Sequence, residues 1–85
     1  MIAQIIYTKD SIQEREAGDM AERLAKLRVT AKLVEADSAE GIATCQLYDL
    51  TGRPAVVLAR DDGTMVERWQ NAWPTIAEVS YLAHQ

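Results

Sequence analysis

The sequence has few of the residues that build disulfide frameworks. It contains one cysteine, two prolines and no phenylalanine among 85 residues. Cys45 alone cannot form an internal disulfide, and small domains made for oxidising compartments usually carry several cysteines. The start of the chain also lacks the basic residues of a secretory signal. These absences predict a cytoplasmic protein.

Positive charge and long apolar runs are scarce as well. Nine Lys and Arg face 13 Asp and Glu, which gives a formal net charge of -4, and no basic run offers a footprint for nucleic acid or anionic membranes. The longest purely apolar stretch, Ala55 to Ala59, is far below the roughly 18 residues that span a bilayer. We therefore expect no nucleic-acid partner and no membrane partner.

What remains is the composition of an ordinary globular domain. Apolar residues make up 48% of the chain and charged residues 26%. A chain of this length has room for one hydrophobic core. We therefore expect a single domain over residues 1–85.

The first half of the chain shows alternating strand and helix patterns. Residues Ile2–Thr8 are short, apolar and partly β-branched, which predicts a buried strand. Ser11 with Glu14 predicts a capping box at the start of a helix, and apolar residues then recur every three or four positions. This predicted buried stripe consists of Ala17, Met20, Ala21, Leu24 and Leu27. Residues 31–36 predict a second strand, parallel to the first.

The second half begins with a weaker helix. Asp37 with Glu40 predicts its cap and Tyr48 its approximate end, while Gly41 weakens the pattern. Residues 51–54 then break the chain.

A hairpin and a last helix complete the pattern. The apolar run 55–59 predicts a strand covered on both faces. Asp61–Thr64 predicts a turn into an antiparallel strand over 65–69. Thr75 with Glu78 predicts a third capping box, at the start of a terminal helix.

The resulting order is β-α-β-α-β-β-α, an α/β fold with a mixed four-stranded sheet and helices on both faces. Three stretches carry a resemblance: residues 5–10, residues 31–33 with Asp37, and residues 48–55. On these, the chain resembles the thioredoxin-like superfamily, in a glutaredoxin-sized form. The resemblance covers nearly the whole chain and implies the strand order 2-1-3-4.

The most specific element of the resemblance is the spacing of Tyr48 and Pro54. Thioredoxin-like chains commonly place a tyrosine six residues before their cis-proline, so the resemblance implies that Pro54 is cis. It also implies a groove beside that proline in which the backbone binds an extended peptide or glutathione.

The chain departs from the family at the start of the first helix. Catalytic members carry a CxxC or CxxS motif there, where the helix N-terminus favours a reactive thiolate. The matching residues here are 12–15, or 11–14 if the loop is one residue shorter, and none contains sulfur. We therefore expect no thiol oxidoreductase activity, no catalytic residue and no cofactor.

The surface near Pro54 is the first candidate binding site. By the resemblance, Arg53 lies there beside Ser11, Ile12 and Gln13. Arginine offers a planar fork of donors that suits a carboxylate of a peptide or ligand. The alternative is that Arg53 simply pairs with a neighbouring acid in a loop.

Trp73 is the second candidate, either as an interface residue or as part of the core edge, where Trp69 is also expected. Met65 and Trp69 are predicted on one face of an edge strand. Such an edge allows either a monomer or a weak homodimer.

The remaining polar candidates favour structural roles. The resemblance places Cys45 at a small apolar position facing the sheet, where a buried thiol is inert. His84 has no partner at metal-ligand spacing, and Asp61-Asp62 lack the other ligands of a calcium loop, so we expect no metal.

Two functional hypotheses follow. The first is a non-catalytic protein- or peptide-binding module that uses the cis-proline groove or the tryptophan-bearing edge. The alternative is a single-cysteine redox or glutathione-handling protein that uses Cys45.

Overall fold

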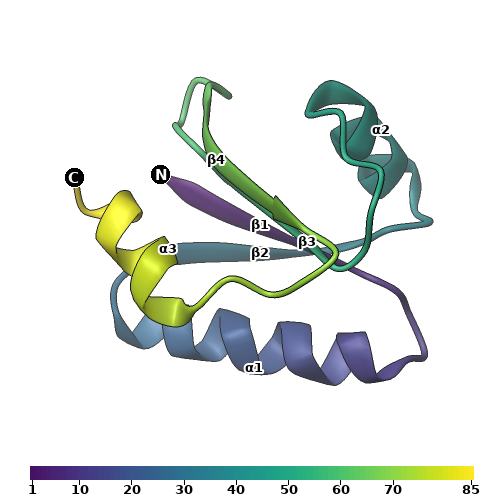
Figure 1. The fold of residues 1–85 in the computed structure, drawn as a ribbon, viewed down its shortest axis with the longest axis horizontal. Coiled ribbons are helices and arrows are strands. Elements are labelled where there is room, and N and C mark those ends of the chain that lie inside the picture. The colour runs from purple at the N-terminus through teal and green to yellow at the C-terminus, as the bar shows by residue number, and fades with distance from the viewer.

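In the computed structural model, which describes residues 1–85, four strands form one sheet with helices on both faces (Figure 1). The strands are β1 (Ile2–Tyr7), β2 (Thr30–Glu35), β3 (Ala55–Ala59) and β4 (Met65–Gln70), and the helices are α1 (Ile12–Lys26), α2 (Ala39–Leu47) and α3 (Ile76–Ala83). The strand order is β2-β1-β3-β4. β1 pairs with β2 in parallel and the other pairs are antiparallel. The predicted fold class and strand order are confirmed.

Two hydrophobic clusters lie on opposite faces of the sheet. One joins β1 and β3 to α1 and α3, and it includes Ile5 and Val56. The other lies on the α2 face and includes Ile6 and Val57. Neighbouring residues of a strand point to opposite faces. Ile5 and Ile6 of β1 therefore contribute to different clusters, and so do Val56 and Val57 of β3. All five residues of β3 are buried, as its continuous apolar run predicts.

The first helix starts as predicted, but its capping contacts differ from a reciprocal box. Ser11 is the N-cap, and its hydroxyl accepts the N–H of Gln13 at 3.2 Å. The Glu14 carboxylate accepts the N–H of Asp10 instead of the Ser11 N–H. The buried stripe was predicted one residue too long. Leu27 is the C-cap, and it is 45% exposed because the helix has already ended.

The predicted cap of the second helix is wrong by one residue. Ser38 is the N-cap, and its hydroxyl accepts the N–H of Gly41 at 3.0 Å. Asp37 instead pairs with Arg53. Gly41 is buried, and a Cβ at this position would overlap the carbonyl oxygen of Glu35. The glycine that weakens the helical pattern is therefore what lets α2 approach the end of β2.

The other end of α2 is tied to the β3–β4 hairpin. Nη1 of Arg68 donates to the carbonyl oxygens of Tyr48 and Asp49, at 2.6 and 2.8 Å. The Tyr48 hydroxyl donates to the Gly63 carbonyl at 2.8 Å. A cation at carbonyls that a helix leaves unpaired is favourable. These contacts hold the segment between α2 and β3 against the sheet.

The hairpin contains a bulge that overturns one prediction. The register of β3 against β4 shifts between Leu58 and Ala59. An extra residue in one strand changes which face the following side chains take. Val66 and Trp69 consequently pack against the α1 face, whereas Met65 is exposed. Met65 and Trp69 therefore do not share a face, while Trp69 does lie at the core edge.

The start of α3 and the turn between β3 and β4 have the hydrogen bonds that the sequence predicts. The capping box of Thr75 and Glu78 is present in both directions. In the hairpin turn, Asp62 accepts the N–H of Thr64 at 2.9 Å. This backbone hydrogen bond lowers the pKa of the Asp62 carboxyl. His84 lies within 2.8 Å of the Leu27 carbonyl oxygen through Nε2.

None of the helices combines the length and apolarity that crossing a bilayer requires. The structure contains no group of three or more His, Cys, Asp or Glu residues that could hold a metal ion.

The close approach at Gly41 generates a test of the fold. We expect Gly41→Ala to lower the free energy of unfolding by about 1–3 kcal/mol, because the added methyl meets backbone oxygens that cannot rotate away. The matched control is Gly18→Ala in α1, where a Cβ has no neighbour within 4 Å. It should raise the free energy of unfolding by about 0.5–1 kcal/mol. Urea denaturation followed by circular dichroism measures both, and equal effects would contradict this account of Gly41.

The tie between β4 and α2 generates a second test. We expect Arg68→Ala to lower the free energy of unfolding by about 1–3 kcal/mol, because two carbonyl groups lose a charged donor. Arg60→Ala is the control, since the exposed Arg60 side chain makes no hydrogen bond or ion pair. Its effect should stay within about 0.5 kcal/mol. Thermal or urea unfolding measures both variants. An unchanged free energy of unfolding for Arg68→Ala would show that the hydrogen bonds from Arg68 to Tyr48 and Asp49 do not stabilise the fold.

Candidate functional site

Four loops meet at one end of the sheet. Tyr7 at the end of β1 is paired with Glu35 at the end of β2. The first residue of β3, Ala55, is paired with Ile6 and with Gln70 at the end of β4. The loops that follow β1, β2 and β4 therefore gather around the loop that precedes β3.

The cis-proline loop, residues 51–54, is held firmly by β4. The peptide bond before Pro54 is cis. The carbonyl of Pro54 accepts the N–H of Asn71 at 2.9 Å. The side-chain oxygen of Gln70 accepts the N–H groups of Thr51 at 2.9 Å and Gly52 at 3.1 Å. The Gln70 side chain and the backbone hydrogen bond between Asn71 and Pro54 thus fix the conformation of this loop.

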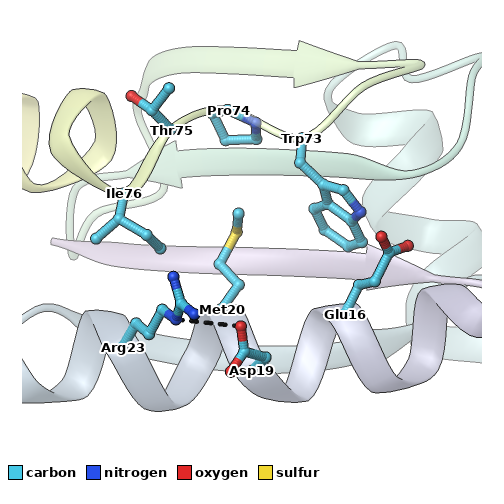
Figure 2. A pocket seen from close by; sticks show the side chains of 8 residues that line it. All are labelled: Glu16, Asp19, Met20, Arg23, Trp73, Pro74, Thr75 and Ile76. Atoms are coloured by element: carbon cyan, nitrogen blue, oxygen red, sulfur yellow. Dashed lines mark ion pairs between the residues drawn. The ribbon is translucent and has the colours of Figure 1, made fainter.

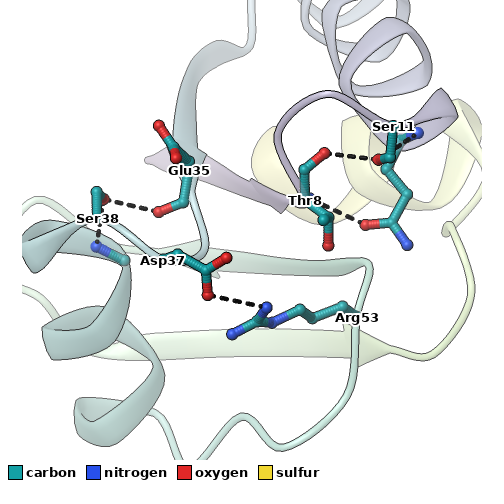
Figure 3. A network of polar contacts seen from close by, with 8 residues as sticks. Thr8, Ser11, Glu35, Asp37, Ser38 and Arg53 are labelled. Atoms are coloured by element: carbon teal, nitrogen blue, oxygen red, sulfur yellow. Dashed lines mark hydrogen bonds and ion pairs between the residues drawn. The ribbon is translucent and has the colours of Figure 1, made fainter.

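Arg53 is the least engaged residue of the loop. Its backbone N–H and C=O make no hydrogen bond within the chain. Its guanidinium lies 3.2 Å from the carboxylate of Asp37, and the two side chains are 42% and 69% exposed (Figure 3). The alternative prediction, an ion pair within the loops, is therefore what the structure contains. Such exposed pairs contribute about 0–1 kcal/mol, so a ligand carboxylate can displace Asp37 at little cost.

The loop between β1 and α1 is organised by its own side chains. The Ser11 hydroxyl donates to the Thr8 carbonyl at 2.6 Å, and the Gln13 side-chain oxygen accepts the Thr8 N–H at 3.1 Å (Figure 3). Ile12, between them, is 74% exposed. Ser11 and Gln13 thus shape the loop, while Ile12 presents an apolar side chain to solvent.

Cys45 is less buried than a core thiol. It packs against the cluster on the α2 face, yet it is only partly buried. It also lines an open pocket of about 310 Å³, the Cys45 pocket, together with Ala36, Ile42, Gln46, Asp49, Leu50 and Arg53. The prediction that Cys45 is a buried thiol facing the sheet is therefore only partly right. Sequence reasoning missed that Cys45 and Arg53 share a pocket, because the path of the chain between α2 and β3 brings them together.

Trp73 belongs to a different hollow, on the α1 face. A pocket of about 340 Å³, the Trp73 pocket, is lined by Glu16, Asp19, Met20, Arg23, Trp73, Pro74, Thr75 and Ile76 (Figure 2). Trp73 is half-buried and packs against the core cluster beneath it. The structure places Trp73 at the core edge. The same side chain lines an open pocket, and its role as an interface residue stays a prediction. The Trp73 pocket shares no lining residue with the Cys45 pocket.

The comparisons with known proteins agree on the fold and reach no further. No protein-family model matches the chain, and no curated protein matches its sequence. Among solved structures, thioredoxin 1 from the thermophilic eubacterium Thermosipho africanus TCF52B is similar with a TM-score of 0.71 and 12% identity, over 99% of this chain and 91% of that one. A thioredoxin from Thermus thermophilus is similar with a TM-score of 0.59 and 19% identity, over 98% of this chain and 71% of that one.

At such identities structural likeness is evidence of architecture, and function has to be argued from the residues at the site. The four-stranded sheet, the order of its strands and both similar structures give one conclusion. The chain has a thioredoxin-like fold.

Proposed function

We propose that this protein is a non-catalytic binding module that holds an extended segment of a protein or peptide at the cis-proline loop. The observation that carries the proposal is the unpaired backbone N–H and C=O of Arg53, on a loop that β4 holds in place. A fixed loop with an unpaired donor and acceptor can add main-chain hydrogen bonds to an extended partner, as sheet edges do. Because the loop is already ordered, binding costs little conformational entropy.

The side chains around the loop indicate what such a partner offers. Ile12 supplies exposed apolar surface, and a partner that covers this surface gains binding free energy because apolar area is removed from water. The Arg53 guanidinium can exchange the Asp37 carboxylate for a carboxylate of the partner. An extended segment with an acidic side chain or a C-terminal carboxylate and a neighbouring apolar residue therefore fits best.

The same loops argue against thiol exchange. This reaction needs a thiolate that attacks a disulfide sulfur. The loop that positions such a thiolate in catalytic relatives of this fold contains Ser11, Ile12 and Gln13 here, and it orders itself through hydroxyl and carboxamide contacts. None of these groups can form a mixed disulfide.

A defined peptide tests the binding proposal. A phage-displayed random peptide library is panned on the wild-type protein, and one selected peptide is synthesised. We expect amide shifts in NMR spectra to concentrate in residues 8–13, 51–55 and 71–73, and we expect Arg53→Glu to weaken binding at least tenfold (about 1.4 kcal/mol) through charge reversal. Arg60→Glu is the control and should bind as wild type does. Selected peptides that bind Arg53→Glu unchanged, or that shift only other residues, would overturn the proposal.

One observation favours the alternative of a single-cysteine redox protein. Cys45 and Arg53 line the same open pocket, so the only thiol lies near the residue that precedes the cis-proline. Against it, reactive thiolates are typically placed at helix N-termini, whereas Cys45 lies near the C-terminal end of α2. The nearby guanidinium is also engaged by Asp37. We therefore rank this function second.

Turnover of a disulfide separates the two functions. The wild-type protein and Cys45→Ala are assayed for reduction of insulin and for deglutathionylation of a mixed disulfide, each with a reductant supplied. We expect neither variant to exceed the rate of the reductant alone, because no thiol lies at the α1 start. Cys45-dependent turnover in either assay would establish the second function in place of the first.

A further inference from the structure

The Trp73 pocket combines an aromatic ring with a carboxylate that has no partner. Glu16 makes no ion pair and no hydrogen bond, and it is exposed on the surface of α1. In Figure 2 the Glu16 carboxylate points toward the Trp73 indole, and both side chains line the same pocket. An indole face and a carboxylate both attract a cation, the first through its quadrupole and the second through its charge.

The other charges in the pocket cancel each other. Asp19 and Arg23 form an ion pair of 3.1 Å along α1. In Figure 2 Arg23 lies toward Ile76, and Asp19 lies between Arg23 and Glu16. Counting Glu16, Asp19 and Arg23, the pocket keeps one net negative charge, and that charge lies at the tryptophan end. The pocket is thus complementary to a cation and not to an anion.

The size and floor of the pocket select the kind of cation. Its volume of about 340 Å³ is at the small end of the range of roughly 300–1,000 Å³ seen for ligand sites. Met20 at the pocket is 7% exposed, which provides an apolar floor for methylene groups. A bulky cofactor does not fit such a shallow, open hollow, whereas one long basic side chain does. A guanidinium is planar, so it can stack on the indole while its edge donates to a carboxylate.

From this complementarity we infer that the Trp73 pocket binds an arginine side chain of a protein partner, with the guanidinium on the Trp73 indole and paired with Glu16. The site lies on the α1 face and shares no lining residue with the pocket of Arg53. The inference therefore goes beyond the proposed function and does not require it.

The test uses the peptide acetyl-Gly-Arg-Gly-amide as the probe. The indole N–H resonance of Trp73 is followed by NMR during titration, with assignment from Trp73→Phe. We expect a saturable shift of this resonance with the arginine peptide. The same peptide with citrulline, which keeps the shape and lacks the charge, should bind at least fivefold more weakly. A lysine peptide should also bind more weakly, because an ammonium group cannot stack flat.

Variants of exposed α1 residues test the binding site without disturbing the hydrophobic core, so a change in binding does not reflect loss of the fold. Glu16→Gln should weaken the arginine peptide at least fivefold. Glu22→Gln is the matched control, because Glu22 pairs with Lys26 on the same helix outside the pocket, and it should bind as wild type does. Arg53→Ala should also bind unchanged, so failure of the cis-proline proposal leaves this result intact. Equal binding of arginine and citrulline peptides, equal binding of arginine and lysine peptides, or an unaffected Glu16→Gln would overturn the inference.

Discussion

Burial of β3 between two strands and two core layers is the constraint on which the rest of the structure depends. Its five residues pair with β1 on one side and β4 on the other, and their side chains alternate between the two clusters. A shift of one residue would exchange every side chain between the two faces. The pairing of Ala55 with Ile6 and Gln70 therefore determines where the chain enters the sheet. The cis-proline loop immediately before Ala55 is placed by that register.

The elements around β3 then hold the loop from both directions. Gln70 and Asn71, at the end of β4, bond to the loop, while Arg68 on the same strand binds the end of α2. Gly41 allows the start of α2 to lie against the end of β2. The contacts of Gln70, Asn71 and Arg68 hold the segment that carries Arg53 from both of its ends. The loop is thus held in place while the backbone N–H and C=O of Arg53 stay unpaired, and the proposed binding of an extended partner rests on this arrangement.

The two pockets differ in the charge and type of the side chains that line them. On the α2 face, a guanidinium, a thiol and an exposed isoleucine of α2 gather near the cis-proline loop. On the α1 face, a tryptophan and an unpaired carboxylate lie over a buried methionine. One surface suits an anionic group and the other a cationic group. The two pockets lie on opposite faces of the molecule, because the sheet lies between α1 and α2 (Figure 1).

Several features of the site could be predicted from the sequence because they depend on neighbours along the chain. The capping residues Ser11 and Thr75 and the turn at Asp62 follow from hydrogen bonds that span two or three residues. Features that depend on other elements were missed or misplaced. Asp37 resembles an N-cap in sequence, but its carboxylate is taken by Arg53 from another loop.

Alternation and periodicity in the sequence thus determined the strand and helix pattern, because local apolar spacing decides which faces must be buried. The resemblance of residues 5–10, 31–33 with Asp37, and 48–55 to thioredoxin-like chains then indicated the architecture. Only the tertiary structure decided that a bulge separates Met65 from Trp69 and that Gly41 serves close packing. It also brought Cys45 to Arg53 and Glu16 to Trp73. These juxtapositions arise from the register of strands and the approach of helices, which join residues far apart in the chain and leave no local pattern.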